Sequence, residues 1–141
     1  ESFLLEVETT AMSKSFKMIL LDAFQQLSGW RSPPKLSKLA QTSWETLKRR
    51  PRLYQEIASS VKDVGGSSPQ WQQYWKKNPV DHWTNKSPAV FEVESDHFKP
   101  VIGLEGEQIP PFEEMVQELI DYRLASYEAR QSSKQEQQSV E

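Results

Sequence analysis

The stretch that decides the fold is Ser-Lys-Ser-Phe-Lys-Met-Ile-Leu-Leu-Asp-Ala-Phe-Gln-Gln-Leu, residues 13–27. Thr10 or Ser13 can cap its start, and Gly29 can follow its end. Burying one apolar face of such a helix contributes roughly 1.5–3 kcal/mol per large side chain, before the cost of ordering the chain. The sequence therefore predicts a central core helix, because its apolar residues fall at steps of three and one: Phe16, Ile19, Leu20, Ala23, Phe24 and Leu27.

Four more helical segments are predicted after a break at residues 29–34, which ends in two prolines. Apolar residues at helical spacing favour helices over residues 34–49 and 52–62. A short aromatic helix is expected over residues 69–78, with Pro79 beginning another turn. The last helix is predicted from Pro111 to about Ala129.

The β component is small. Residues 3–8 alternate in part between apolar and polar side chains, which favours a short strand, and residues 89–94 and 97–102 predict a hairpin around Ser95 and Asp96. The expected fold class is mainly α with a small β hairpin. We interpret it as a single winged-helix-like helical domain over residues 1–130, followed by a disordered polar tail over residues 131–141.

The composition narrows the setting. A chain of 141 residues is long enough for one domain with a real core, and its start at Glu1 and polar end suggest a piece of something longer. The absence of cysteine excludes disulfides, thiolate catalysis and cysteine zinc sites, which fits the cytoplasm. No apolar run approaches 18 residues, so no membrane span is expected.

Catalytic motifs are missing from the sequence. It contains no phosphate-binding glycine loop, no HExxH and no GxSxG. His82 and His97 stand apart and lack a metal-ligand spacing. Glu92 and Glu94 share one face of a predicted strand, where a solvated surface is favoured over a cation site. We therefore expect a non-enzymatic protein with neither metal nor cofactor.

The most informative signal is an uneven charge distribution. Residues 30–52 hold seven Lys or Arg against Glu45 alone, a net charge of +6, whereas residues 89–141 hold four against twelve acids. Such a block can bind nucleic-acid phosphates, although a solvated helix face explains it about equally well. The candidate phosphate-binding residues are Lys35, Lys38, Lys48, Arg49, Arg50 and Arg52.

A second candidate combines aromatic side chains with cations. Trp71, Tyr74 and Trp75 precede Lys76 and Lys77, and aromatic rings beside cations can stack bases. However, two tryptophans four residues apart are also how a short helix is fixed to a core. In a protein-docking interpretation, a partner subunit would bind the aromatic set Trp71, Trp75 and Trp83.

Three stretches carry a family resemblance: Thr-Thr-Ala-Met-Ser-Lys-Ser-Phe-Lys-Met (9–18), Trp-Gln-Gln-Tyr-Trp-Lys-Lys-Asn-Pro-Val (71–80) and Asp-Tyr-Arg-Leu (121–124). They resemble an accessory region that follows the motor in some bacterial DEAD/DEAH-box (superfamily 2) helicases of restriction and defence type. The resemblance spans about residues 5–128. It implies a DNA-associated module of a larger defence machine, and it transfers neither ATPase activity nor catalytic residues, since the motor's nucleotide-binding motifs are absent here.

The sequence as a whole predicts a non-enzymatic nucleic-acid-binding module, with DNA favoured, that works inside a bacterial defence or helicase-type complex. Two alternatives stay open. One is a protein–protein interaction module, and the other is a small helical subunit of an RNA-guided (CRISPR-type) effector complex that lines a guide or target strand.

Overall fold

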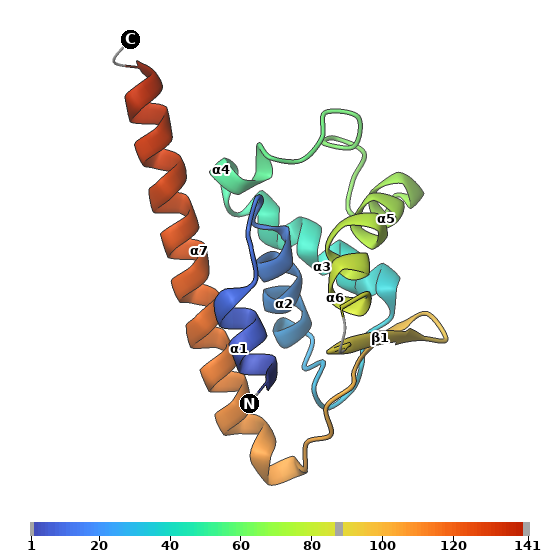
Figure 1. The fold of residues 1–141 in the computed structure, drawn as a ribbon. Helices are drawn as coiled ribbons and strands as arrows, with labels where there is room; N and C mark the ends of the chain where they lie inside the picture. Colours follow the sequence, from blue (N-terminus) through green and yellow to red (C-terminus); the bar gives the residue numbers. More distant parts are fainter. Residues whose placement is uncertain (1, 87–88, 140–141) are drawn as a thin grey trace.

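The computed structural model describes residues 2–86 and 89–139, and its helices surround a single central helix (Figure 1). The fold class predicted from the sequence, mainly α with a small hairpin, is confirmed, whereas the winged-helix arrangement stays a prediction. In chain order the elements are α1 Ser2–Thr9, α2 Phe16–Gln26, α3 Leu36–Lys48, α4 Pro51–Tyr54, α5 Pro69–Trp75, a π-helical turn Lys76–Val80, α6 Asp81–Thr84, β1 Phe91–Glu94, β2 His97–Pro100, a 3-10 turn Gly106–Gln108 and α7 Ile109–Ser139.

Helix α2 is the predicted core helix, and it is buried on more than one side. It lies between α3 and the long helix α7, and it also contacts the π-helical turn (Figure 1). Met18 and Leu21, which lie outside the predicted apolar stripe, are as fully buried as Ile19 and Leu20. A helix that is apolar around most of its circumference belongs inside a core, and the other elements have to cover it.

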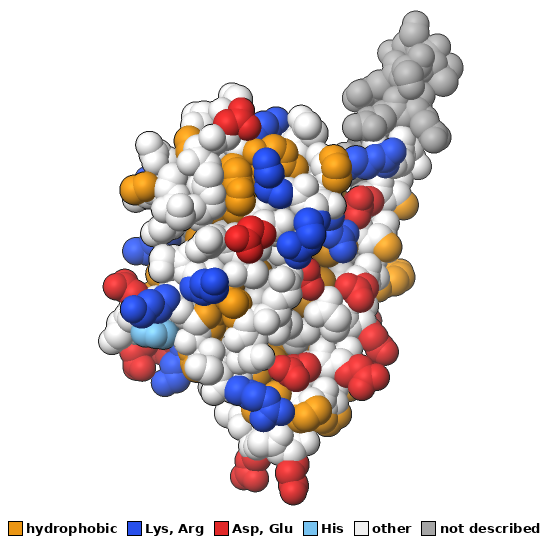
Figure 2. Space-filling view, turned by 180° about the vertical axis from the view of Figure 1, so that it is seen from behind, with side chains coloured by type: hydrophobic (Ala, Val, Ile, Leu, Met, Phe, Trp, Pro, Cys, Tyr) orange, Lys and Arg blue, Asp and Glu red, His pale blue; other side chains and the backbone are white. Residues whose placement is uncertain are grey.

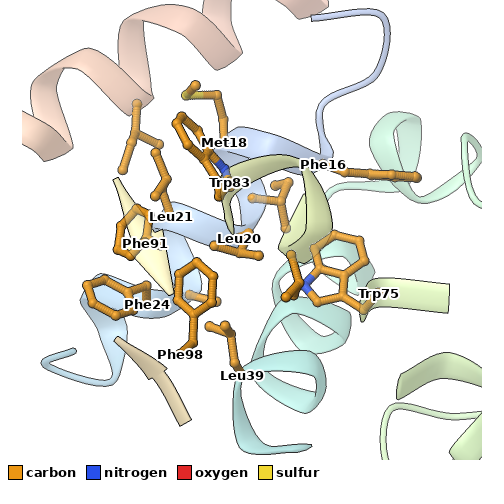
Figure 3. Close-up of a cluster of buried hydrophobic side chains, with 14 of the residues drawn as sticks. Phe16, Met18, Leu20, Leu21, Phe24, Leu39, Trp75, Trp83, Phe91 and Phe98 are labelled. Atoms are coloured by element: carbon orange, nitrogen blue, oxygen red, sulfur yellow. The ribbon is translucent and has the colours of Figure 1, made fainter. Parts of the chain in front are cut away.

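Aromatic side chains from distant segments complete this core (Figure 3). The ring of Trp75 lies 5.2 Å from that of Phe16 at the start of α2. At the other end of α2, Phe24 contacts both Phe91 and Phe98, whose rings stack at 4.5 Å. These contacts attach the aromatic helix and the hairpin to α2, since aromatic pairs stabilise beyond the area that they bury.

The hairpin forms where the sequence predicts it. Glu94 pairs with His97, and the two turn residues, Ser95 and Asp96, have φ of 51° and 63°, as a tight two-residue turn requires. The amide of Leu36 donates to the carbonyl oxygen of Asp96 at 2.8 Å. The turn of the hairpin is therefore fixed to the first turn of α3.

The strand predicted for residues 3–8 is wrong, because this segment is helix α1. Phe3 and Val7, four residues apart, are both buried on the face turned to the core. The guanidinium of Arg123 on α7 donates to the carbonyl oxygens of Val7, Glu8 and Thr10 at 2.9, 2.6 and 2.6 Å. This arginine thus supplies partners for carbonyls that the end of a helix leaves unbonded, a tertiary contact that local alternation does not reveal.

Three predicted boundaries also differ. A helix is expected over residues 52–62, but α4 ends at Tyr54 and single turns follow it. The hydroxyl of Tyr54 donates a hydrogen bond to the carbonyl oxygen of Lys62 and so holds these turns in place. Pro79 does not begin a separate turn but lies inside a π-helical one. Helix α7 continues past Ala129 to Ser139, since adding residues to an existing helix is easier than starting one. The division into a domain and a disordered tail stays a prediction.

A glycine substitution tests the packing against α2. A Cβ on Gly29 would lie 2.4 Å from a ring carbon of Phe24, which is fully buried. We expect Gly29→Ala to lower the free energy of unfolding by about 1–3 kcal/mol, measured by urea denaturation. Gly103→Ala is the control, because a Cβ there meets no atom within 4 Å of the described structure. Equal urea midpoints for the two variants would contradict the packing described here.

Candidate nucleic-acid interface

The π-helical turn Lys76–Val80 lies between two hollows in the surface. It joins α5 to α6 and contains Pro79, which is buried and has no amide hydrogen to donate to the preceding turn. π-helical turns within α-helices often mark functional sites. Here the turn places two consecutive lysines on different hollows, because Lys76 lines one and Lys77 lines the other.

The smaller hollow, here called the basic pocket, has a volume of about 290 Å³. Two segments far apart in the sequence form it: the start of α2 and the π-helical turn with α6. Among the described residues its lining contains three lysines and no Asp or Glu. The residues that line it are Ser13, Lys14, Phe16, Lys17, Lys77, Asn78, Pro79 and His82.

Two of these lysines are held by the protein itself. The ammonium of Lys17 donates to the hydroxyl of Thr10 at 3.2 Å and to the carbonyl of Ala11. Burial lowers the pKa of Lys17, and the nearby cations Lys86 and Arg123 lower it further, against the opposite effect of Glu6. Since cations crowd this corner, an anion bound here would relieve their repulsion.

Lys14 is the second lysine that the protein holds, and it lies at the surface. It is exposed, lies 5.6 Å from the centre of the Phe16 ring, and donates to the carbonyl oxygen of Glu56 at 3.2 Å. Lys77 and Asn78 on the opposite side of the pocket are also exposed. Their ammonium and amide groups can therefore turn toward a ligand without breaking the core.

His82 completes the pocket as a neutral imidazole. Burial lowers its pKa to about 4, with further lowering by Lys17 and Lys86 and a smaller opposing effect of Glu6, which pairs with Lys86 at 3.0 Å. Its Nε2 lies 3.5 Å from the hydroxyl of Thr10. The low pKa thus arises mainly from burial, and the two lysines add to it.

The larger hollow, here called the hairpin groove, has a volume of about 790 Å³. It lies between the first turns of α3, the aromatic helix and the turn of the hairpin. Its buried members are apolar, and its rim is polar with two cations and one acid. The groove is lined by Lys35, Leu36, Ser37, Ala40, Pro69, Gln72, Gln73, Trp75, Lys76, Val80, Ser95, Asp96 and His97.

The structure divides the predicted phosphate-binding residues. Lys35 and Lys76 reach the hairpin groove and Lys77 reaches the basic pocket. Lys38 is exposed in the first turn of α3, and Lys48 and Arg49 lie at its far end. Because α3 rises 1.5 Å per residue, the two ends are about 20 Å apart.

The basic side chains at and just beyond the C-terminal end of α3 already contact other residues of the protein. Arg50 forms an ion pair of 3.0 Å with Glu128 of α7, and Arg52 donates to Ser132. Lys48 lies over the ring of Tyr54, 5.1 Å from its centre. Figure 2 shows basic side chains in separate groups, with acidic side chains between them and along the edge formed by α7. The six residues of the predicted block therefore do not form one continuous basic surface, and their role in phosphate binding stays a prediction.

The three tryptophans predicted to dock a partner lie in the core. Trp71, Trp75 and Trp83 are 0%, 1% and 0% exposed. The indole N–H groups of Trp71 and Trp83 donate to the carbonyls of Ala40 and Lys17 at 2.7 and 3.2 Å. The docking prediction is wrong for these residues, since their spacing reflects attachment of the helix to the core and leaves a partner no ring to contact. Among the residues whose burial the structure describes, the exposed large apolar side chains are instead Leu5, Val93, Val101, Met115 and Tyr122.

Sequence reasoning missed Lys14, Lys17 and His82. One signal was available: Lys17 lies in the first turn of α2, where the helix dipole favours acidic side chains and disfavours cations. A local choice that conflicts with the local structure often marks a functional position.

The structure was also searched for a metal-binding site and for a membrane-spanning helix. Among residues 2–86 and 89–139, no group of three or more histidines and acids is placed to hold a metal ion. Glu94 instead pairs with Lys99 at 3.4 Å. Within the same residues, none of the helices combines the length and the apolar character that crossing a bilayer requires.

Comparison of the chain with family models, with curated proteins and with solved structures gave no match.

The environment of His82 predicts a pH dependence of stability. An unfolded histidine titrates near 6.5, whereas folded His82 titrates near 4. Below pH 6.5 the unfolded chain therefore binds a proton that the native protein does not, and this contribution to stability falls until about pH 4. We expect His82→Gln to remove this part of the decline in urea midpoint between pH 6.5 and 4.

The control for this experiment is His97→Gln, which leaves His82 in place and should retain the wild-type decline. Parallel pH profiles for wild type and His82→Gln would show that neither burial nor the neighbouring cations lower the pKa of this imidazole.

Proposed function

We propose that this chain is a non-enzymatic nucleic-acid-binding module whose basic pocket receives backbone phosphates. The observation that carries the proposal is the convergence of Lys14, Lys17 and Lys77 on one hollow that has no acid in its described lining. Folding normally separates like charges, so a gathering of cations from two distant segments favours an anionic ligand. Ser13 and Asn78 add uncharged donors of the kind that contact phosphate oxygens.

Two further lysines lie beyond the basic pocket, on the other side of the π-helical turn, where they could contact additional phosphates. Lys76, the first residue of the turn, lines the hairpin groove, and Lys35 lines the same groove from the start of α3. Further backbone phosphates could thus contact Lys76 and Lys35 on the rim of this groove, outside its apolar interior. Binding of this kind releases counterions and weakens with salt in proportion to the number of phosphates contacted.

The proposal shifts the interface away from the C-terminal end of α3. There, Arg50 is already paired with Glu128 of α7. A polyanion approaching this end would meet the carboxylate of Glu128, whereas the lining of the basic pocket offers it no acid among the residues described. For phosphate binding, the net charge of residues 30–52 therefore matters less than the acidic side chains that lie beside them in the fold.

We further propose that the module acts in the cytoplasm as part of a larger bacterial defence or helicase-type complex, with DNA as the favoured nucleic acid. The absence of cysteine supports the compartment. The resemblance of residues 9–18, 71–80 and 121–124 to a helicase accessory region supports the complex and the choice of DNA. The first of these stretches contains Lys14 and Lys17, and the second contains Lys76 and Lys77.

A pair of double charge reversals tests the pocket. We expect Lys14→Glu with Lys77→Glu to weaken binding of a labelled oligonucleotide at least tenfold, measured by fluorescence anisotropy at low salt. Two lost phosphate contacts should also reduce the slope of log affinity against log salt by about 1.4–1.8. Both lysines are exposed, so the fold should persist, as checked by circular dichroism.

The matched control is Lys48→Glu with Arg49→Glu, which makes the same change in net charge on exposed residues at the far end of α3. It should retain most of the affinity and the wild-type salt slope. The opposite result, with binding lost in the control and kept in the pocket variant, would return the interface to the basic block of the sequence. An absence of binding by the wild-type protein would overturn the proposed function itself.

A further inference from the structure

The hairpin groove is built before any ligand arrives. One wall is the hairpin turn, which is fixed to the start of α3 by the bond from Leu36 N to Asp96 O and by an antiparallel bridge between Lys35 and His97. The opposite wall is α5, whose Trp71 and Trp75 are fully buried in the core. A groove between two rigid walls can bind a ligand without first paying an ordering cost.

The groove combines apolar contact with hydrogen-bonding groups of both kinds. Its interior includes the buried residues Ala40 and Val80 beside Leu36. On the rim, the side-chain amide of exposed Gln73 offers a donor and an acceptor. Nδ1–H of His97 donates to the carbonyl of Ser95 at 2.8 Å, so in the neutral ring Nε2 is left as an acceptor.

This combination fits a nucleobase better than a phosphate. A base has an apolar face and an edge that alternates donors and acceptors, and a volume of about 790 Å³ is in the usual range for small-molecule sites. Asp96 on the rim disfavours a phosphate at that point and can accept from a base amino group. The phosphate-binding pocket is close by, because the consecutive residues Lys76 and Lys77 line the two hollows.

We infer that the hairpin groove takes up an unpaired nucleobase from a single strand whose backbone phosphates occupy the basic pocket. The inference rests on the proposed function and narrows it to single-stranded nucleic acid. In a duplex the bases are stacked and paired, so their faces cannot enter the groove, whereas a single strand can turn a base outward.

Three labelled DNA probes of equal length test the inference on the whole chain: a single strand, the same strand lacking its bases, and the duplex. We expect the single strand to bind at least about tenfold more tightly than the abasic strand and more tightly than the duplex. The abasic strand keeps every phosphate, so it should still bind through the basic pocket and still lose affinity in the double variant Lys14→Glu with Lys77→Glu.

The outcomes separate the two proposals. Equal binding of the base-containing and abasic strands, or tighter binding of the duplex, would overturn the base site while leaving the phosphate site standing. An absence of binding by all three probes would overturn both.

Two groove variants locate the base. Gln73→Ala and His97→Ala should each weaken the single strand severalfold and leave the abasic strand unchanged, because each removes a group that contacts only the base. Gln70→Ala is the matched control: this exposed α5 glutamine does not line the groove, and its variant should bind as the wild type does. Equal affinity of all three variants for the single strand would place the base elsewhere and overturn the inference.

Discussion

The structure depends on covering α2 on several sides at once. Its run from Met18 to Leu21 is completely buried, so no single neighbouring helix can satisfy it. Helices α3 and α7, the π-helical turn and the aromatic residues of the hairpin all pack against it, although they come from separate parts of the chain. This requirement also explains why Trp75 and Trp83, which the sequence offers as candidates for docking a partner, are buried in the core.

The same constraint determines where a functional surface can arise. An apolar helix has polar residues mainly at and beyond its ends, and at the start of α2 Lys17 lies in the first turn and Lys14 just before the helix. The π-helical turn packs on α2 at this end and brings Lys77 opposite them. The cations therefore gather because the core places these two segments together. The lining of the pocket, as far as the structure describes it, contains no acid that would form an ion pair with them.

Local sequence patterns correctly predicted the elements whose conformation is determined by their own residues. The apolar spacing of residues 13–27, the turn at Ser95 and Asp96, and the i, i+4 tryptophans each translate directly into α2, the hairpin and a buried aromatic helix. Prediction from the sequence failed where the local structure depends on a residue that is far away along the chain. Helix α1 depends on Arg123, more than one hundred residues away, and the basic pocket joins Lys17 to Lys77, sixty residues apart in the sequence.

The most direct measurement is the set of backbone amide chemical-shift changes while a short single-stranded DNA is titrated into the isotope-labelled chain. The account predicts that the largest changes fall on residues 13–17 and 76–82, with a second group at the hairpin turn. Changes concentrated at residues 48–52 or along the acidic face of α7 would contradict it, and so would an unchanged spectrum at low salt.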